Sequence, residues 1–251
     1  MFTIEERDGI RDRILAIAHA DPRIVAGAMI GSLTQGLGDR WSDLDLGFGV
    51  GDGATPAEVL ADWTPRLERE CQAVHLFDLA SGAAIYRVFL FPGALQVDLS
   101  FAPAAGFGAR GPKFRLLFGA AVEHPRAEPP SAPHLFGLGV HHAVRARFCV
   151  ERGRLWQAQH WISELREIGL TLACRRRELE TAQGRGYDEL PSEALKPFEE
   201  TLVRALDRAE LLRALRDAID GLLREAGEAR ALAVKVEGQL RELTSRDFRH
   251  R

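Results

Sequence analysis

Two aspartates, Asp43 and Asp45, alternate with Leu44 and Leu46 in the sequence. This alternation predicts a β-strand, in which side chains two positions apart lie on the same face. The leucines would then pack into a core, and the two carboxylates would lie side by side on the opposite face. Two like charges at that separation are unfavourable unless a cation neutralises them. Carboxylate oxygens are ligands that Mg²⁺ prefers, so the pattern predicts a magnesium site.

A third carboxylate, Asp98, lies in a second alternating segment, Leu95–Phe101. Its neighbours in the sequence are apolar, which again predicts a strand with the carboxylate on one face and the core on the other. If this strand lies beside the strand of Asp43 and Asp45, three carboxylates converge at one place. Such a set can hold two divalent ions that clamp an in-line phosphoryl displacement.

A glycine-punctuated turn, Gly31-Ser32-Leu-Thr-Gln-Gly36, follows the apolar run 24–30. Glycine has no Cβ, so a polyphosphate can approach its main chain closely. Backbone N–H groups and the Ser32 hydroxyl are suitable donors to phosphate oxygens. Arg40, shortly before Asp43, is a candidate contact for the triphosphate, and a solvated loop arginine is the alternative.

Three cations, Arg110, Lys113 and Arg115, lie in the glycine-rich segment 107–115, after the strand of Asp98. This segment is either a connection that closes over phosphate or a plain basic loop.

The elements around these residues alternate between helix and strand in the first half of the chain. Thr3 and Glu6 form a candidate capping box at the start of a helix. Further along, Pro92-Gly93 predicts the tight turn of an antiparallel hairpin. Periodicity predicts helices over about 3–20 and 55–72, and strands over 24–30, 43–50, 74–79, 85–91 and 95–101.

The second half of the chain follows a proline-rich stretch, 124–134, and contains no convincing strand. Amphipathic patterns predict helices over about 135–151, 154–182, 192–205 and 207–243, with breaks at Gly153, at 184–191 and near Gly227. The predicted fold class is therefore α+β. An N-terminal domain with a small mixed sheet, residues 1–125, is followed by an all-α helical bundle domain, residues 126–251.

Composition excludes several classes of protein. The 251 residues are 46% hydrophobic and 27% charged, as in ordinary globular proteins, and 33 basic against 36 acidic residues give a net charge of −3. A general nucleic-acid coat or a polybasic membrane-surface protein would carry a large positive excess, so neither nucleic acid nor membrane is the expected partner. Three widely spaced cysteines argue against a disulfide framework, and no segment is apolar enough to span a membrane, so we expect a cytoplasmic protein.

The order Gly31-Ser32-x-x-x-Gly36, then Asp43-x-Asp45, then a distant Asp98 resembles the DNA polymerase beta-type nucleotidyltransferase superfamily. The motifs cover about residues 25–101. A following helical domain is similar to that of the antibiotic-modifying branch, which includes kanamycin and lincosamide nucleotidyltransferases. The resemblance implies Mg²⁺-dependent transfer of a nucleoside monophosphate, usually AMP from ATP, to a hydroxyl of a small molecule, with release of pyrophosphate. It also implies that an antibiotic is one class of acceptor.

The resemblance also assigns roles to the motif residues. Gly31 and Ser32 would hold the β- and γ-phosphates, Asp43 and Asp45 would bind the metals, and Asp98 would complete the metal site near the attacking hydroxyl.

Two carboxylates are candidates for the general base. A carboxylate of the helical domain is implicated in the kanamycin enzyme's family, and Glu164 is the candidate here, with a surface or ion-pair role as its alternative. Asp98 is the competing base, because a metal-bound carboxylate can accept a proton from the hydroxyl.

Two further functions fit the same pattern. One is an antitoxin-like or regulatory nucleotidyltransferase that acts on or binds a macromolecular partner. The other is an inactive nucleotide-binding scaffold. A homodimer is a further expectation, because related antibiotic-modifying enzymes can build their sites across a dimer.

Overall fold

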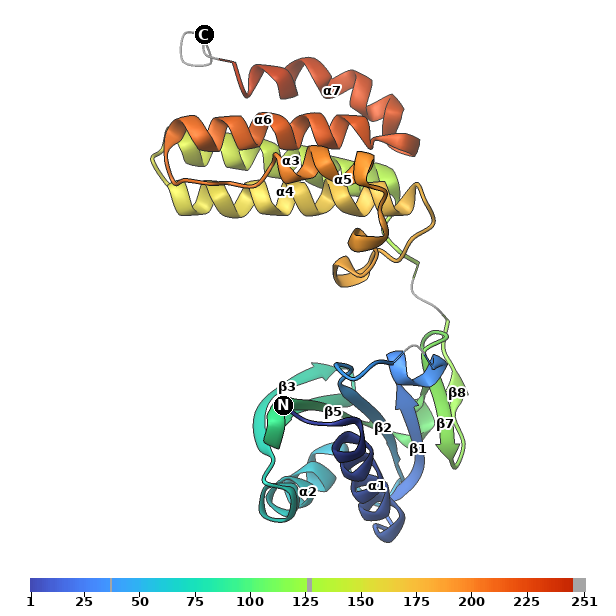
Figure 1. Ribbon diagram of the computed structural model, residues 1–251. Helices are drawn as coiled ribbons and strands as arrows, with labels where there is room; N and C mark the ends of the chain where they lie inside the picture. Colours follow the sequence, from blue (N-terminus) through green and yellow to red (C-terminus); the bar gives the residue numbers. More distant parts are fainter. Residues whose placement is uncertain (37, 126–127, 246–251) are drawn as a thin grey trace. The chain divides into compact units, whose positions relative to one another are not determined.

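The protein forms two compact units, Met1–Glu128 and Pro129–Arg251, in a computed structural model that describes residues 1–36, 38–125 and 128–245 (Figure 1). The first unit combines helices with a mixed sheet, and the second is helical. The predicted fold class, an α+β part followed by an all-α part, is confirmed.

The first unit is built on a six-stranded sheet with the strand order β3-β4-β5-β2-β1-β7. Of its neighbouring pairs within the described residues, β2 and β5 are parallel, and each of the others is antiparallel. The predicted hairpin of β4 and β5 is confirmed. The strands are β1 (Ile24–Ile30), β2 (Leu44–Val50), β3 (Val74–Ser81), β4 (Ala84–Phe91), β5 (Leu95–Pro103) and β7 (Phe114–Phe118).

Two helices, α1 (Ile4–Ala20) and α2 (Pro56–Cys71), cover one face of this sheet (Figure 1). Each begins with a complete capping box, in which the N-cap threonine and the glutamate three residues later satisfy each other's backbone N–H groups. Beneath the helices, alternate residues of β2 and β5 form the core. Leu44, Leu46 and Phe48 are fully buried, so the intervening residues of β2 face away from the helices.

The strand β7 corrects the sequence prediction for the segment after β5. Residues 107–115 were expected to be a connection, but Phe114 begins a strand that pairs with β1. Phe114–Phe118 lacks an alternating pattern, so only its pairing with β1 makes it a strand. Two short strands, β6 (Gly108–Ala109) and β8 (Val122–Glu123), also form a small parallel pair that the sequence did not predict.

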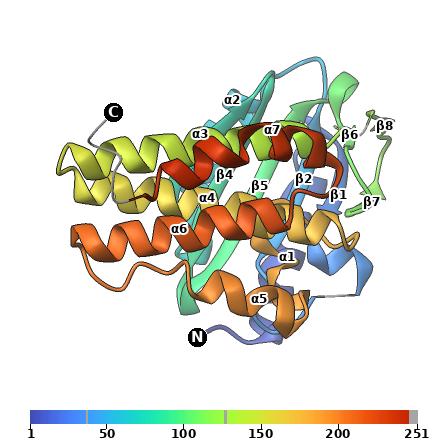
Figure 2. The ribbon, with the colours of Figure 1, turned by 90° about the horizontal axis from the view of Figure 1, so that it is seen from above.

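The second unit is a bundle in which α3, α4 and α6 run alongside one another (Figure 2). Its core is formed by apolar side chains from these helices, including the fully buried Phe136, Ile162, Leu165, Leu215 and Leu222. The helices are α3 (Ala132–Glu151), α4 (Leu155–Arg175), α5 (Ser192–Glu199), α6 (Arg208–Arg224) and α7 (Arg230–Glu242).

Two of these helices are shorter than predicted. Helix α4 ends at Arg175 instead of continuing to 182, because the backbone turns left-handed at Glu178 (φ +58°) and Leu179 folds back onto the cluster that contains Phe198. Helix α5 ends at Glu199 instead of 205. There the buried Thr201 hydroxyl donates a hydrogen bond to the Phe198 carbonyl, which is one of the carbonyls left without a partner within the helix at its C-terminal end.

None of the helices within the described residues is both long enough and apolar enough to cross a membrane.

Phe48 is the best test of the first core, because its ring lies 5.3 Å, centroid to centroid, from those of both Trp63 and Phe101. We expect Phe48→Ala to lower the free energy of unfolding of the first unit by about 3–5 kcal/mol, since it leaves a cavity in a packed core. Phe148, which is 39% exposed on α3 of the second unit, provides the control. Phe148→Ala should change the free energy of unfolding of that unit by about 0.5 kcal/mol or less. Urea denaturation read by peptide-resolved hydrogen exchange separates the two units. Equal effects of the two substitutions would contradict this packing.

Candidate functional site

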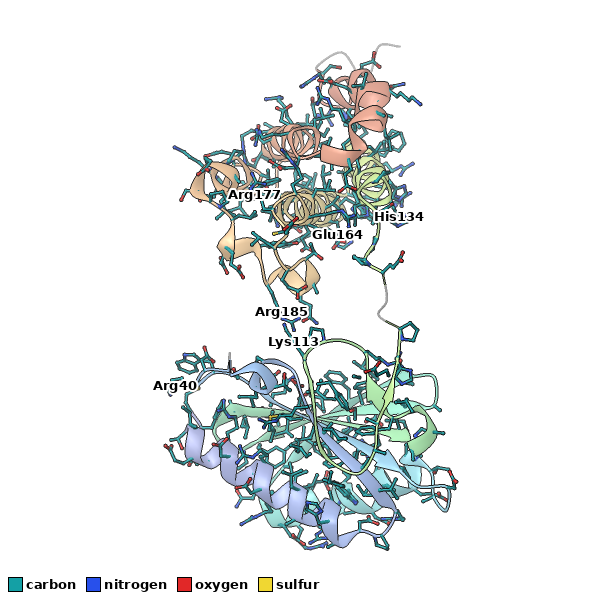
Figure 3. All side chains as sticks on the ribbon, turned by 90° about the vertical axis from the view of Figure 1, so that its right-hand side faces the viewer. Arg40, Lys113, His134, Glu164, Arg177 and Arg185 are labelled. Atoms are coloured by element: carbon teal, nitrogen blue, oxygen red, sulfur yellow. The ribbon has the colours of Figure 1, made fainter. Side chains whose placement is uncertain are left out.

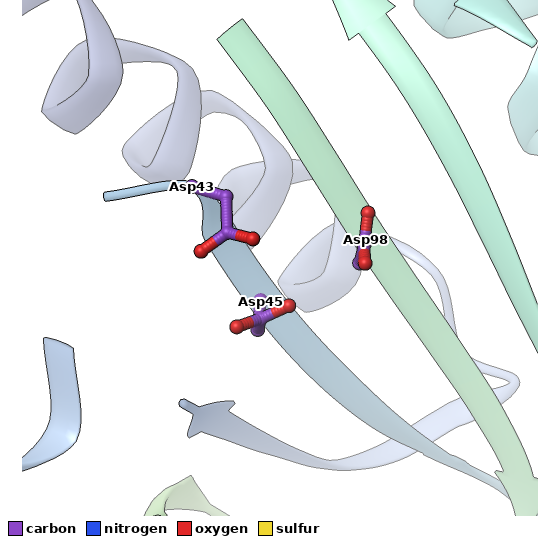
Figure 4. Close-up of side chains that lie close together, drawn as sticks. All are labelled: Asp43, Asp45 and Asp98. Carbon is purple, nitrogen blue, oxygen red and sulfur yellow. The ribbon is translucent and has the colours of Figure 1, made fainter. Parts of the chain in front are cut away.

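The parallel pair of β2 and β5 brings the three predicted aspartates together. Asp45 lies opposite Asp98 in the register of the two strands, and Asp43 directly precedes β2. Leu44 and its register partner Val97 are fully buried against the helices, so the aspartates lie on the other face of the sheet. Figure 4 shows the three carboxylates side by side on the two strands.

The three carboxylates are close enough to share one cation. One oxygen of each lies within 4.8 Å of an oxygen of the other two, and all three side chains are half-buried. Among the described residues, no arginine or lysine forms an ion pair with Asp43 or Asp98. The donor set is therefore all oxygen and rich in negative charge, which fits Mg²⁺.

The electrostatics of Asp98 reflect this crowding. Burial raises the pKa of Asp98 above its ordinary value, and the nearby charge of Asp43 raises it further. A hydrogen bond from the Gln96 amide to Asp98 Oδ1, 3.0 Å long, opposes part of the rise in pKa. The carboxylate group of Asp98 thus holds its proton more tightly than an isolated aspartate would.

The Gly31 turn lies directly against this cluster. Gly31 has φ +79°, and a Cβ at this position would collide with the carboxylate of Asp45. Glycine is therefore required here both by the backbone conformation and by the approach of Asp45. The N–H of Gly31 donates to the carbonyl of Lys113, 3.1 Å away, so this particular donor is occupied.

Ser32 and Arg40 occupy the segment between β1 and β2. Ser32 begins a short 3₁₀ helix, η1 (Ser32–Gln35), and its half-buried hydroxyl donates to Ser42 Oγ at 3.4 Å. Arg40 is exposed (Figure 3). Its guanidinium lies 4.2 Å from the centre of the Trp41 ring. The structure thus links Ser32 to the residue that precedes Asp43 and places Arg40 in the same loop, stacked on an exposed aromatic ring.

Lys113 is a residue whose position the sequence did not predict. Because Ile30 pairs with Phe114, the chain before β7 returns to the Gly31 turn, and the Lys113 backbone contacts Gly31 there. The sequence identified a basic segment, but the pairing of β1 with β7 was needed to place it. Figure 3 shows Lys113 on the loop that leads into β7.

Glu164 lies in α4 of the second unit and is half-buried. It lines an open pocket of about 670 Å³ together with His142, Glu167 and Asp188. Burial lowers the pKa of His142, and the charge of Glu164 opposes that change. Glu164 and the three aspartates belong to different compact units, so its role as a general base stays a prediction.

The chain matches no protein-family model and no curated protein. Among solved structures, it is similar to the crystal structure of an aminoglycoside 6-adenyltransferase from Bacillus subtilis. The TM-score is 0.37 and the sequence identity 13%, and the alignment covers 95% of this chain and 98% of that chain.

The raised pKa of Asp98 predicts that its charge destabilises the metal-free protein. The folded state binds the proton more tightly than the unfolded state. The resulting loss in free energy of unfolding is therefore absent well below the ordinary pKa of 3.8, and it grows as pH rises through the raised pKa. In EDTA at neutral pH, we expect Asp98→Asn to increase the free energy of unfolding by roughly 0.5 kcal/mol, a small effect because water screens a half-exposed group. The gain should disappear in acid.

The matched control is Asp52→Asn, at the exposed loop beyond the other end of β2, which should leave stability unchanged at both pH values. Chemical denaturation in EDTA across the pH range measures both variants. A loss of stability in Asp98→Asn at neutral pH would contradict the electrostatic account.

Proposed function

We propose that the protein is a Mg²⁺-dependent nucleotidyltransferase. It transfers a nucleoside monophosphate from a nucleoside triphosphate, with ATP as the expected donor, to a hydroxyl of a small molecule and releases pyrophosphate. The convergence of Asp43, Asp45 and Asp98 beside the Gly31 turn is the observation that supports this function. The resemblance of the motifs adds the class of reaction and, among acceptors, antibiotics.

The three aspartates would hold the metal. The sequence favours two Mg²⁺ ions at this site. When bound, Mg²⁺ supplies positive charge against the phosphate oxygens. The aspartates orient that charge, and the register of β2 with β5 fixes Asp45 and Asp98 relative to each other.

The reaction itself exchanges one phosphorus–oxygen bond for another. The acceptor oxygen bonds to the α-phosphorus, the bond from that phosphorus to the bridging oxygen breaks, and pyrophosphate leaves. The acceptor proton goes to a carboxylate, and Asp98 is the first candidate, because a metal-bound carboxylate near the attacking hydroxyl can accept it. Glu164 is the second candidate base.

The phosphates of the donor would be held by the residues around the Gly31 turn. The Ser32 hydroxyl is half-buried at the start of η1, and glycine at position 31 leaves room for close approach. Lys113 and Arg40 supply positive charge from two different loops. Neither forms an ion pair with a carboxylate among the residues that the structure describes, so both charges are available to phosphate.

Removing either carboxylate of the Asp-x-Asp motif tests the function. We expect Asp43→Asn and Asp45→Asn each to reduce pyrophosphate release on the order of 10²-fold or more, because the charge that holds the metal against the transferred group is lost. The fold should remain, since both side chains lie outside the core. Asp52→Asn is the control and should keep full activity.

The first measurement is thermal stability with ATP, GTP, CTP and UTP, each with and without Mg²⁺, followed by an acceptor screen for pyrophosphate release. Undiminished release by either variant would overturn the proposal. A Mg²⁺-dependent shift without release for any small acceptor would favour the inactive scaffold or the macromolecular partner.

Lys113 should affect binding of the donor more than the chemical step. We expect Lys113→Met to raise the KM for the nucleotide about tenfold, the loss of one charge-assisted contact to phosphate, with a smaller change in kcat. Lys235→Met, on the exposed surface of α7, is the control and should leave KM unchanged. Steady-state kinetics with the preferred nucleotide measure both, and an unchanged KM in Lys113→Met would remove Lys113 from the site.

A further inference from the structure

A buried arginine on α1, Arg7, reaches the loop that leads into Asp43. Arg7 is 5% exposed, and its Nη1 donates to the carbonyl of Asp39 at 2.7 Å and to the carbonyl of Ser42 at 3.2 Å. These two carbonyls belong to the two ends of the segment 39–42. A single guanidinium group on the core-facing helix therefore holds both ends of this segment.

The partners of Arg7 are mainly these carbonyls. The carboxylate that it approaches is Asp8, 3.7 Å from Nε and 40% exposed, and Nε itself makes no hydrogen bond with any described residue. Burying a cation without a close ion pair is costly. A buried arginine at this position therefore indicates that the two charge-assisted bonds to the loop are of value.

The loop has no regular secondary structure, and side-chain bonds hold its shape. The backbone N–H of Asp39 donates to Ser42 Oγ at 3.0 Å, and that of Trp41 donates to Asp39 Oδ1 at 2.8 Å. The Ser42 hydroxyl also receives the hydrogen bond from Ser32. The contacts of Arg7 thus extend through the loop to the Gly31 turn.

Asp43 depends on this loop more than its two partners do. Asp45 and Asp98 are fixed by the pairing of β2 with β5, whereas that pairing begins at Leu44, one residue after Asp43. The carbonyl of Ser42 belongs to the same rigid peptide plane as the N–H of Asp43. Holding that carbonyl therefore fixes the direction in which the chain presents Asp43.

We propose that Arg7 is a positioning residue: its bonds to the loop 39–42 set the place of the Asp43 carboxylate in the metal site. This inference rests on the proposed function for its catalytic consequence. The two hydrogen bonds from Arg7 to the loop 39–42, called the clamp below, are a property of the fold and can be measured without turnover.

The test compares Arg7→Met, Arg7→Lys and Arg13→Met with the wild-type protein. Arg13 is a matched control, because it lies on the same helix and donates at 3.0 Å to another backbone carbonyl, that of Glu70. Arg7→Lys keeps the charge with a shorter, single-headed donor. Two quantities are measured in the full chain: hydrogen exchange of the peptide 38–46, and the affinity for Mn²⁺ by titration.

We expect exchange in the peptide 38–46 to be about tenfold faster in Arg7→Met, because the loop opens locally. The affinity for Mn²⁺ should fall about tenfold, the range seen when a residue that orients a metal ligand is lost. Arg7→Lys should restore part of both quantities, and Arg13→Met should match the wild type. If Arg7→Met fails to fold, Arg7→Lys still carries the comparison, with smaller shifts in the same direction.

Two outcomes would contradict the inference, and a third would contradict the proposed function. Unchanged exchange in the peptide 38–46 would overturn the clamp. Faster exchange with an unchanged Mn²⁺ affinity would show a structural role alone and overturn the positioning role. A wild-type protein that binds no Mn²⁺ would instead overturn the proposed function, and the exchange data would still decide the clamp.

Discussion

The parallel pairing of β2 with β5 is the constraint on which the candidate site depends. Its register places Asp45 opposite Asp98, and the burial of the alternate residues forces both carboxylates onto one face. A shift of one residue would turn the aspartates into the core and the leucines toward solvent, which the hydrophobic effect opposes strongly. The energy that holds two like charges together thus comes from the apolar side chains behind them.

Part of this arrangement follows from the sequence alone. The alternation around Asp43 and Asp98 predicts two strands with the aspartates on one face, and the structure contains both. The capping box predicted at Thr3 marks the start of the first covering helix. In these segments the local pattern and the tertiary packing agree, so the periodicity of the side chains was sufficient to predict the strands and helices.

Other features depend on contacts between distant parts of the chain. Strand β7 has no alternating pattern and exists through its pairing with β1, so Lys113 could not be placed beforehand. Arg7 is one of many charged residues in the helix α1, and only the fold shows that it is buried against the segment 39–42. Helix α4 ends early because Leu179 packs into a cluster, which propensity alone does not reveal.

The separation of the chain into two units, each with its own hydrophobic core, has a consequence for how such a protein diversifies. The three aspartates, the Gly31 turn and the clamp by Arg7 all lie within Met1–Glu128. Substitutions that repack the helices of Pro129–Arg251 act on a separate core. Repacking the core of the second unit can therefore leave the geometry of the three aspartates unchanged.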